Sequence, residues 1–194
     1  MEVIKSNTPQ RLVVGISGAS GVIYGIRLLE LLQDTSIETH LVVTDSAVVT
    51  LGYESNHKLA YLKSLATTYY SNKDIGAAIS SGSFKTMGMV IAPCSIRSMS
   101  EIATGVTSSL LARAADVVLK ERRRLVLMVR ETPLHTNHLR NMTALSEVGA
   151  VIAPPVPAFY AKPESLGDMV DHSVGRLLDL FGIELGIVRR WKEE

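Results

Sequence analysis

The chain has 194 residues, of which 46% are hydrophobic, and its 20 Lys and Arg residues nearly balance its 19 Asp and Glu residues. This length suits one domain with a sizeable core, and the balanced charge excludes a general attraction to nucleic acid or anionic membranes. No apolar run reaches the ~20 residues of a membrane span, the polar first ten residues contain no secretory signal, and a single cysteine, Cys94, favours a reducing, cytoplasmic compartment.

Five short apolar runs alternate with longer amphipathic segments along the chain. The predicted strands are Leu12–Ile16, Thr39–Val43, Met87–Ala92, Leu125–Val129 and Ala150–Ala153, and the predicted helices are Gly21–Gln33, Ser46–Leu51, Val106–Glu121, Leu134–Glu147 and Ser165–Phe181. Residues 53–83 predict only one or two short helices and a loop. Continuous apolar runs are typical of parallel strands covered on both faces. The pattern therefore predicts a doubly wound α/β sheet, whose ligands bind beyond the carboxyl ends of the strands.

The first predicted strand leads through Ser17-Gly18-Ala19-Ser20-Gly21 directly into a helix. Small residues let a ligand approach the backbone, and the N–H groups of a helix start favour an anion. The glycine spacing is neither that of a dinucleotide fingerprint nor that of a P-loop or a nucleophile elbow. The alternative is a tight turn in which Ser20 is the helix N-cap, and the residues alone leave both interpretations open.

Polar segments also follow the next two strands. Thr44-Asp45-Ser46 can cap a helix, whereas the later Glu54 is interpreted as solvated. Pro93-Cys94-Ser95-Ile96-Arg97-Ser98-Met99 offers two hydroxyls and a cation, which suit a phosphate or a polar ring edge. Cys94 is expected to be a small buried residue rather than a nucleophile.

Charged residues mark the second half of the chain. Arg113 and Lys120 lie seven residues apart on a predicted helix, where a solvated basic face is favoured over phosphate binding. Arg130-Glu131 follows the fourth strand, where an arginine can clamp a phosphate and a glutamate can transfer protons; the alternative is a weak surface ion pair.

The last predicted strand is followed by a proline-stiffened loop, residues 154–163, that presents Phe159 and Tyr160. The final helix carries His172 and Arg176 on one face, because they are four residues apart. The histidines lack the spacing and the glutamate of a zinc motif, so no metal site is predicted.

Taken together, these segments resemble the UbiX/Pad family of flavin prenyltransferases, formerly described as aromatic-acid decarboxylases. The resemblance covers nearly the whole chain in the right order. The pieces that carry it are Gly15–Gly21 with Tyr24-Gly25, Pro93-Cys94-Ser95, Arg113–Arg123, Arg130–Leu134, Pro157–Tyr160 and Arg190-Trp191. Ser95-Ile96-Arg97-Ser98 differs from the Ser-Thr-Gly-Thr of many members, and Arg124 stands where proline is common.

The resemblance implies a flavodoxin-like, three-layer α/β fold that binds FMN. It implies metal-independent transfer of a dimethylallyl group from dimethylallyl phosphate to reduced FMN, which gives prenylated FMN, the cofactor of UbiD-type decarboxylases. It further implies a single domain, residues 1–194, in a homo-oligomer, a dodecamer with sites between subunits, in which residues 180–194 complete a neighbour's site.

The family's functional residues map onto matching positions of this sequence. The catalytic set is Ser20, Glu54, Glu131 and Trp191. The FMN-binding set is Gly18, Ala19, Ser20, Thr44, Ser95, Ile96, Arg97, Ser98 and Arg130. The set that binds dimethylallyl phosphate is Arg113, Lys120, Tyr160 and Arg176.

Two other functions compete with this one. An FMN-dependent cysteine decarboxylase relies on a histidine early in the chain, but the segment after the first strand has none. A non-catalytic FMN carrier, or accessory subunit of an aromatic acid decarboxylase, needs only one phosphate site. The second phosphate-binding set therefore favours the transferase.

Overall fold

A computed structural model describes residues 9–192, so the outermost parts of the predicted 1–194 domain and 180–194 segment, residues 1–8 and 193–194, lie outside the described range. Six parallel strands form one sheet in the order β3-β2-β1-β4-β5-β6. The strands are β1 (Arg11–Ile16), β2 (Glu38–Val43), β3 (Thr68–Ser71), β4 (Gly88–Cys94), β5 (Arg124–Val129) and β6 (Val151–Ile152). The α-helices are α1 (Val22–Gln33), α2 (Asp45–Glu54), α3 (Leu59–Leu65), α4 (Ile96–Ala103), α5 (Leu110–Lys120), α6 (Thr136–Glu147) and α7 (Leu166–Asp179), with 3-10 turns η1 (Ala78–Ser80) and η2 (Phe159–Ala161).

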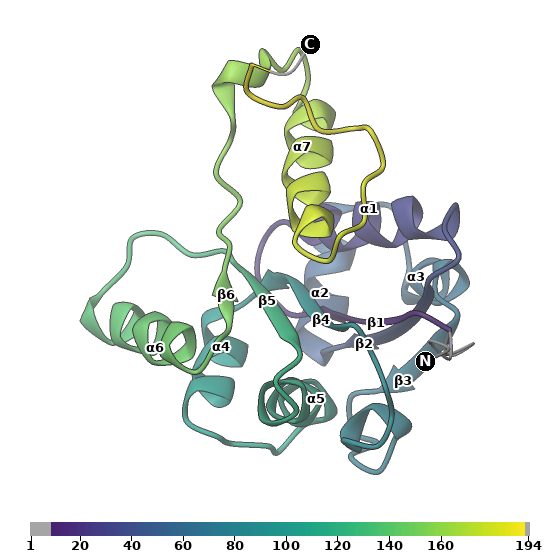
Figure 1. Ribbon diagram of the computed structural model, residues 1–194, viewed down its shortest axis with the longest axis vertical. Coiled ribbons are helices and arrows are strands. Elements are labelled where there is room, and N and C mark those ends of the chain that lie inside the picture. The colour runs from purple at the N-terminus through teal and green to yellow at the C-terminus, as the bar shows by residue number, and fades with distance from the viewer. Residues whose placement is uncertain (1–8, 193–194) are drawn as a thin grey trace, which may run out of the picture.

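The helices cover the sheet in two layers (Figure 1). One core joins α1, α2, α3 and α7 to one face of the sheet, and a second core joins α4, α5 and α6 to the other face. Successive strand residues point to opposite faces, so Leu12 and Val14 enter the first core while Val13 enters the second. The predicted flavodoxin-like, doubly wound, three-layer fold is confirmed.

The sequence prediction missed two elements, helix α4 and strand β3, and misplaced the start of another, because the helix expected from Val106 begins only at Leu110. Helix α3 lies within residues 53–83, where one or two short helices were expected. Strand β3 is a four-residue edge strand with no fully buried residue, so it lacks the apolar run by which the other strands were recognised. Helix α5 begins late because the Ser109 hydroxyl caps it, accepting from the Ala112 N–H.

Helix α1 lies close against the sheet at Gly25. A methyl group added there would lie 2.4 Å from the carbonyl oxygen of Ala92 in β4 and within 2.9 Å of the Ile16 side chain. The absence of a side chain lets the helix approach the two central strands. This contact places the start of α1 at the carboxyl ends of β1 and β4.

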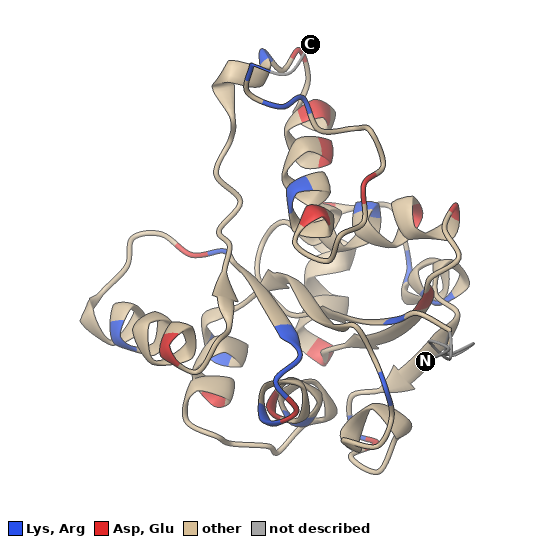
Figure 2. Cartoon of the chain, viewed as in Figure 1, with Lys and Arg blue, Asp and Glu red and all other residues tan. Residues whose placement is uncertain are grey.

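Within residues 9–192, none of the helices is both long and apolar enough to cross a membrane. The same residues include no group of three or more His, Cys, Asp or Glu side chains arranged to hold a metal ion. Figure 2 shows basic and acidic residues intermixed over the helices and loops, as the balanced composition predicts.

Candidate active site

The order of the strands reverses between β1 and β4, and the loops that leave these two strands meet there. The buried Ser17 hydroxyl donates to the Pro93 carbonyl oxygen at 3.0 Å and accepts from the Ser95 N–H at 2.7 Å. Ser17 therefore fixes the distance between the two loops that a ligand at this crevice would contact.

A cavity of about 490 Å³ opens at this junction. It is lined by the first residues of three helices, because α2, α4 and α5 all begin at the carboxyl edge of the sheet. The lining residues include Gly18, Thr44, Asp45, Ser46, Asn72, Ser95, Ile96, Arg97, Ser98, Glu101, Ser108, Ser109 and Glu131. Helix starts present free N–H groups and the positive end of the helix dipole, so the cavity suits a phosphate group.

The loop after β1 leaves its backbone open to this cavity. A methyl group at Gly18 would lie 2.4 Å from both Cβ and Oγ of Ser46, so only glycine fits against the start of α2. The Thr44 hydroxyl caps α2 by accepting from the Ala47 N–H at 3.1 Å, as the sequence predicts. Open backbone, hydroxyls and helix starts fit FMN, whose ring needs room beside the loop and whose phosphate needs donors.

Glu54 closes the loop from the other side. Its Oε2 accepts from the Gly21 N–H at 2.8 Å and from the Val22 N–H at 3.0 Å. The interpretation of Ser20 as the N-cap of α1 is wrong, because Gly21 occupies that position in a left-handed conformation (φ 99°) and a carboxylate from another helix receives the free N–H groups. Glu54 is also not merely solvated, since it ties the end of α2 to the start of α1.

The electrostatics of Glu54 follow from these contacts. Partial burial raises the pKa of its carboxyl group, but hydrogen bonds from Ser20, Gly21 and Val22, aided by the charge of Arg130, outweigh burial and lower the pKa overall. Glu54 is therefore a carboxylate at neutral pH, in contact with the Ser20 hydroxyl. A hydroxyl paired with a carboxylate can pass a proton.

Arg130 and Glu131 leave β5 at the same edge of the sheet, and both are exposed. The Arg130 N–H donates to the Cys94 carbonyl oxygen at 3.1 Å, which places this loop beside the one after β4. Glu131 lies on the cavity wall, where its carboxylate accepts from the Thr132 N–H at 3.0 Å. Cys94 itself is fully buried, which confirms the expected small buried residue, and this burial raises the pKa of its thiol to about 12.

Three predicted residues gather around α7 instead. Tyr160 in η2 places its hydroxyl 3.3 Å from Nε2 of His172, and its ring meets the ring of Trp191 edge-on at 5.4 Å between centroids. Arg176, one turn beyond His172, lines a cavity of about 280 Å³ with the prolines that follow β6. Arg176 donates to Asp179 at 2.7 Å, and Asp179 also receives Arg190 at 3.0 Å.

The two remaining predicted phosphate ligands lie elsewhere. Arg113 is half-exposed on α5 and donates to Asp116 at 2.8 Å. Lys120 lies at the far end of α5, beside Glu121 and Gly82, away from the helix start that lines the cavity. Because α5 and α7 cover opposite faces of the sheet, one chain does not bring Lys120 together with Tyr160 and Arg176 (Figure 1).

Sequence reasoning missed the roles of three residues: Ser17, which joins the loops after β1 and β4, and Asn72 and Ser109, which line the cavity. The Asn72 side chain accepts from the Leu111 N–H at 3.0 Å, so it fixes the first turn of α5 after β3. The signal for Ser109 was a hydroxyl directly before an apolar helical run, which is typical of an N-cap. No local pattern marks Ser17 or Asn72, because their partners lie 78 and 39 residues away.

Comparison with known proteins agrees with this geometry. The family model for flavoproteins matches residues 2–178. The chain is 57% identical over 186 residues to the flavin prenyltransferase UbiX of Escherichia coli (strain K12), covering 94% of this chain and 98% of the relative.

Two solved structures superpose closely on the fold. AnUbiX (PadA1) in complex with FMN and dimethylallyl pyrophosphate has a TM-score of 0.94 and 45% identity, covering 96% of this chain and 100% of its own. The dodecameric FMN-dependent Ubix-like decarboxylase from Escherichia coli O157:H7 has a TM-score of 0.93 and 45% identity, covering 95% of this chain and 100% of its own. The chain therefore belongs to the flavoprotein family and, within it, to the UbiX flavin prenyltransferases.

Proposed function

We propose that this protein transfers the dimethylallyl group of dimethylallyl phosphate to reduced FMN and releases prenylated FMN. The observation that carries the proposal is the cavity at the β1–β4 junction, where the Gly18 backbone and three helix starts meet the Glu131 carboxylate. A related structure that contains FMN and dimethylallyl pyrophosphate supports both ligands. When bound, reduced FMN supplies the nucleophilic ring atoms that take up the C5 group.

The first task of the protein is to make the phosphate a good leaving group. As the allylic C–O bond breaks, the phosphate departs with the electron pair and gains negative charge. We assign its neutralisation to Arg113, Lys120, Tyr160 and Arg176, in place of a metal ion. The indole face of Trp191 would stabilise the allylic cation beside it.

The second task is proton removal as the new ring closes on the flavin. Glu131 on the cavity wall and the Ser20–Glu54 pair are the groups suited to this task. The Glu54 carboxylate is ionised at neutral pH, so it can accept a proton that is relayed through the Ser20 hydroxyl. Gly18, Ala19, Thr44, Arg130 and the Ser95–Ser98 turn would orient FMN for both steps.

We further propose that each site is shared between subunits of a homo-oligomer, by analogy with the dodecameric relative. Lys120 and Arg176 lie on opposite sides of the sheet, so a phosphate that touches both needs residues from two chains. We propose that the exposed Trp191, with residues 180–192, reaches a neighbour's site. We propose a UbiD-type decarboxylase as recipient of the product, and the cytoplasm as the compartment, which suits a chain with one cysteine.

The test is mass spectrometry of the flavin after anaerobic incubation of the pure protein with reduced FMN and dimethylallyl phosphate. A flavin heavier by one C5 unit is expected. Unmodified flavin that stays bound would instead favour the non-catalytic carrier, unless dimethylallyl diphosphate restores the reaction and identifies the diphosphate as the donor. A flavin left unmodified with oxidative loss of carbon dioxide from a peptidyl cysteine would favour the cysteine decarboxylase.

Matched variants separate catalysis from flavin binding. Arg176→Ala and Glu131→Ala are expected to retain FMN while prenylation falls by at least tenfold. Arg140→Ala removes an exposed arginine of α6 outside the cavity and serves as the control. Equal loss of FMN from Arg176→Ala and Glu131→Ala would contradict these assignments.

A further inference from the structure

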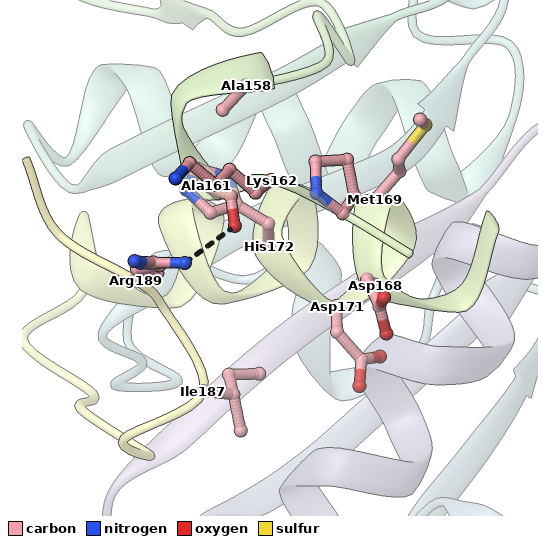
Figure 3. Close-up of a pocket in the computed structure, with 10 residues that line it drawn as sticks. Ala158, Ala161, Lys162, Asp168, Met169, Asp171, His172, Ile187 and Arg189 are labelled. Carbon is pink, nitrogen blue, oxygen red and sulfur yellow. Dashed lines mark hydrogen bonds between the residues drawn. The ribbon is translucent and has the colours of Figure 1, made fainter. Parts of the chain in front are cut away.

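His172 has no role in the function described so far, yet it occupies a central place beside the proposed phosphate ligands. It lies on α7 one turn before Arg176, and its ring meets the Tyr160 ring edge-on at 5.7 Å. It lines the cavity that contains Arg176 and also a second cavity of about 220 Å³ between α7, η2 and the C-terminal segment. Figure 3 shows residues that line this second cavity, among them His172 of α7 and Arg189, which donates to the Ala161 carbonyl oxygen.

The contact between His172 and Tyr160 has two possible directions, since the hydroxyl carries only one proton. If Tyr160 donates to Nε2, the hydroxyl presents only lone pairs to a phosphate and repels it. If Nε2 carries the proton and donates to Tyr160, the hydroxyl proton is free to point at a phosphate oxygen. An anion beside Tyr160 and Arg176 therefore selects the second arrangement.

Aromatic side chains contact Tyr160 at its ring and at its hydroxyl, and these contacts orient the hydroxyl. The Trp191 ring also meets the Tyr160 ring edge-on, with 5.4 Å between the centroids. His172 and Tyr160 form the side-chain hydrogen bond at the hydroxyl end, at 3.3 Å. His172 and Arg176 are four residues apart on one face of α7. This face therefore positions the Arg176 guanidinium and, through His172, orients the Tyr160 hydroxyl.

We propose that His172 is a positioning residue for the phosphate of the allyl donor. It donates from Nε2 to Tyr160 Oη and thereby aims the hydroxyl proton at the phosphate next to Arg176. A donor that itself accepts a hydrogen bond is polarised and becomes stronger. The inference rests on the proposed function only in taking Tyr160 as a phosphate ligand.

The test measures binding of dimethylallyl phosphate by isothermal titration calorimetry to the protein loaded with oxidised FMN, which the proposed reaction does not consume. His172→Phe keeps an aromatic ring without a hydrogen-bonding atom, whereas the amide nitrogen of His172→Gln can replace Nε2. We expect His172→Phe to raise the Kd about tenfold and His172→Gln to stay within about threefold of the wild type. The Kd for FMN is expected to be unchanged in both.

A double-mutant cycle with Tyr160→Phe decides whether His172 acts through Tyr160. We expect His172→Phe to cause no further loss in the Tyr160→Phe background. The proposal would be overturned if the losses of affinity from His172→Phe and Tyr160→Phe multiplied in the double variant, or if Tyr160→Phe bound dimethylallyl phosphate normally. It would also be overturned if His172→Gln bound as weakly as His172→Phe, or if FMN affinity fell in parallel. If the wild type prenylates the flavin but the two losses of affinity multiply, the proposed function stands and only the role of His172 is rejected. If the two substitutions are coupled in binding but the wild type does not prenylate the flavin, the role of His172 stands and the proposed function is rejected.

Discussion

Substitution of Gly25 by alanine tests how closely α1 must approach the sheet. The new Cβ would lie 2.4 Å from the Ala92 carbonyl oxygen, roughly 0.9 Å inside a normal carbon–oxygen contact of about 3.3 Å. The oxygen belongs to the backbone of a central strand and cannot move aside, so α1 must shift. Overpacking of this kind costs about 1–3 kcal/mol, while the better helix propensity of alanine returns about 1 kcal/mol. We expect a net loss of up to about 2 kcal/mol.

The matched control is Gly52→Ala in α2, where an added methyl meets no atom within 4 Å. Here only the helix propensity acts, so a gain of up to about 1 kcal/mol is expected. Urea unfolding at one fixed protein concentration measures both variants, and quenching of flavin fluorescence measures FMN binding. Gly25→Ala should also weaken FMN binding severalfold, because α1 carries the Gly18–Gly21 loop.

The reasoning would be refuted if both substitutions stabilised the protein alike. That result would mean that α1 and β4 separate at little cost, and that the close approach does not position the flavin loop. A destabilised Gly25→Ala variant with unchanged FMN affinity would reject only the link from helix position to binding.

Three further predictions concern the same region. Glu54→Gln should lower the free energy of unfolding at pH 7 by about 1 kcal/mol, a small value because the carboxylate is exposed to solvent. The pKa of Glu54 in the folded protein lies below the unfolded value of 4.5, so the advantage of the wild type should vanish as the pH falls through the folded pKa. Urea unfolding at pH 7 and pH 3 checks this. Thr44→Ala should cost about 1 kcal/mol through loss of the α2 cap, whereas Thr44→Ser should cost little, and a Thr44→Ala variant of wild-type stability would disprove the capping role. Cys94 should resist a thiol reagent at pH 8 in the native protein and react at once in urea, because its pKa is raised to about 12 by burial; rapid labelling of the native protein would contradict that burial.

The features predicted best were the strands and helices, because they depend on residues that are close together in the sequence. Five of the six strands were placed from apolar runs such as Leu125–Val129, and the alternation with helices predicted the parallel sheet. Strand β3 escaped because it is short and lies at the edge with only half-buried side chains. The catalytic and binding residues came from the family resemblance, since no periodicity distinguishes Arg113 in a binding site from Arg113 on a solvated face.

Contacts between distant segments could not be predicted in the same way. The Glu54 carboxylate binds N–H groups more than 30 residues earlier, and a lone glutamate at a helix end gives no indication of this. The same limit applies to the pairing of Tyr160 with His172, which depends on the course of the proline-rich segment after β6. Backbone path, rather than residue type, decides these contacts.

The separation of Lys120 from Arg176 has a genetic consequence under the shared-site proposal. A chain that lacks Lys120 spoils a neighbour's phosphate site while leaving its own Arg176 intact, and a chain that lacks Arg176 does the converse. Two inactive alleles, Lys120→Ala and Arg176→Ala, expressed in one cell would therefore assemble some sites with both cations and recover part of the activity. Two alleles with defects in the same residue would recover none, so the pattern of complementation between alleles would map which residues meet across the subunit boundary.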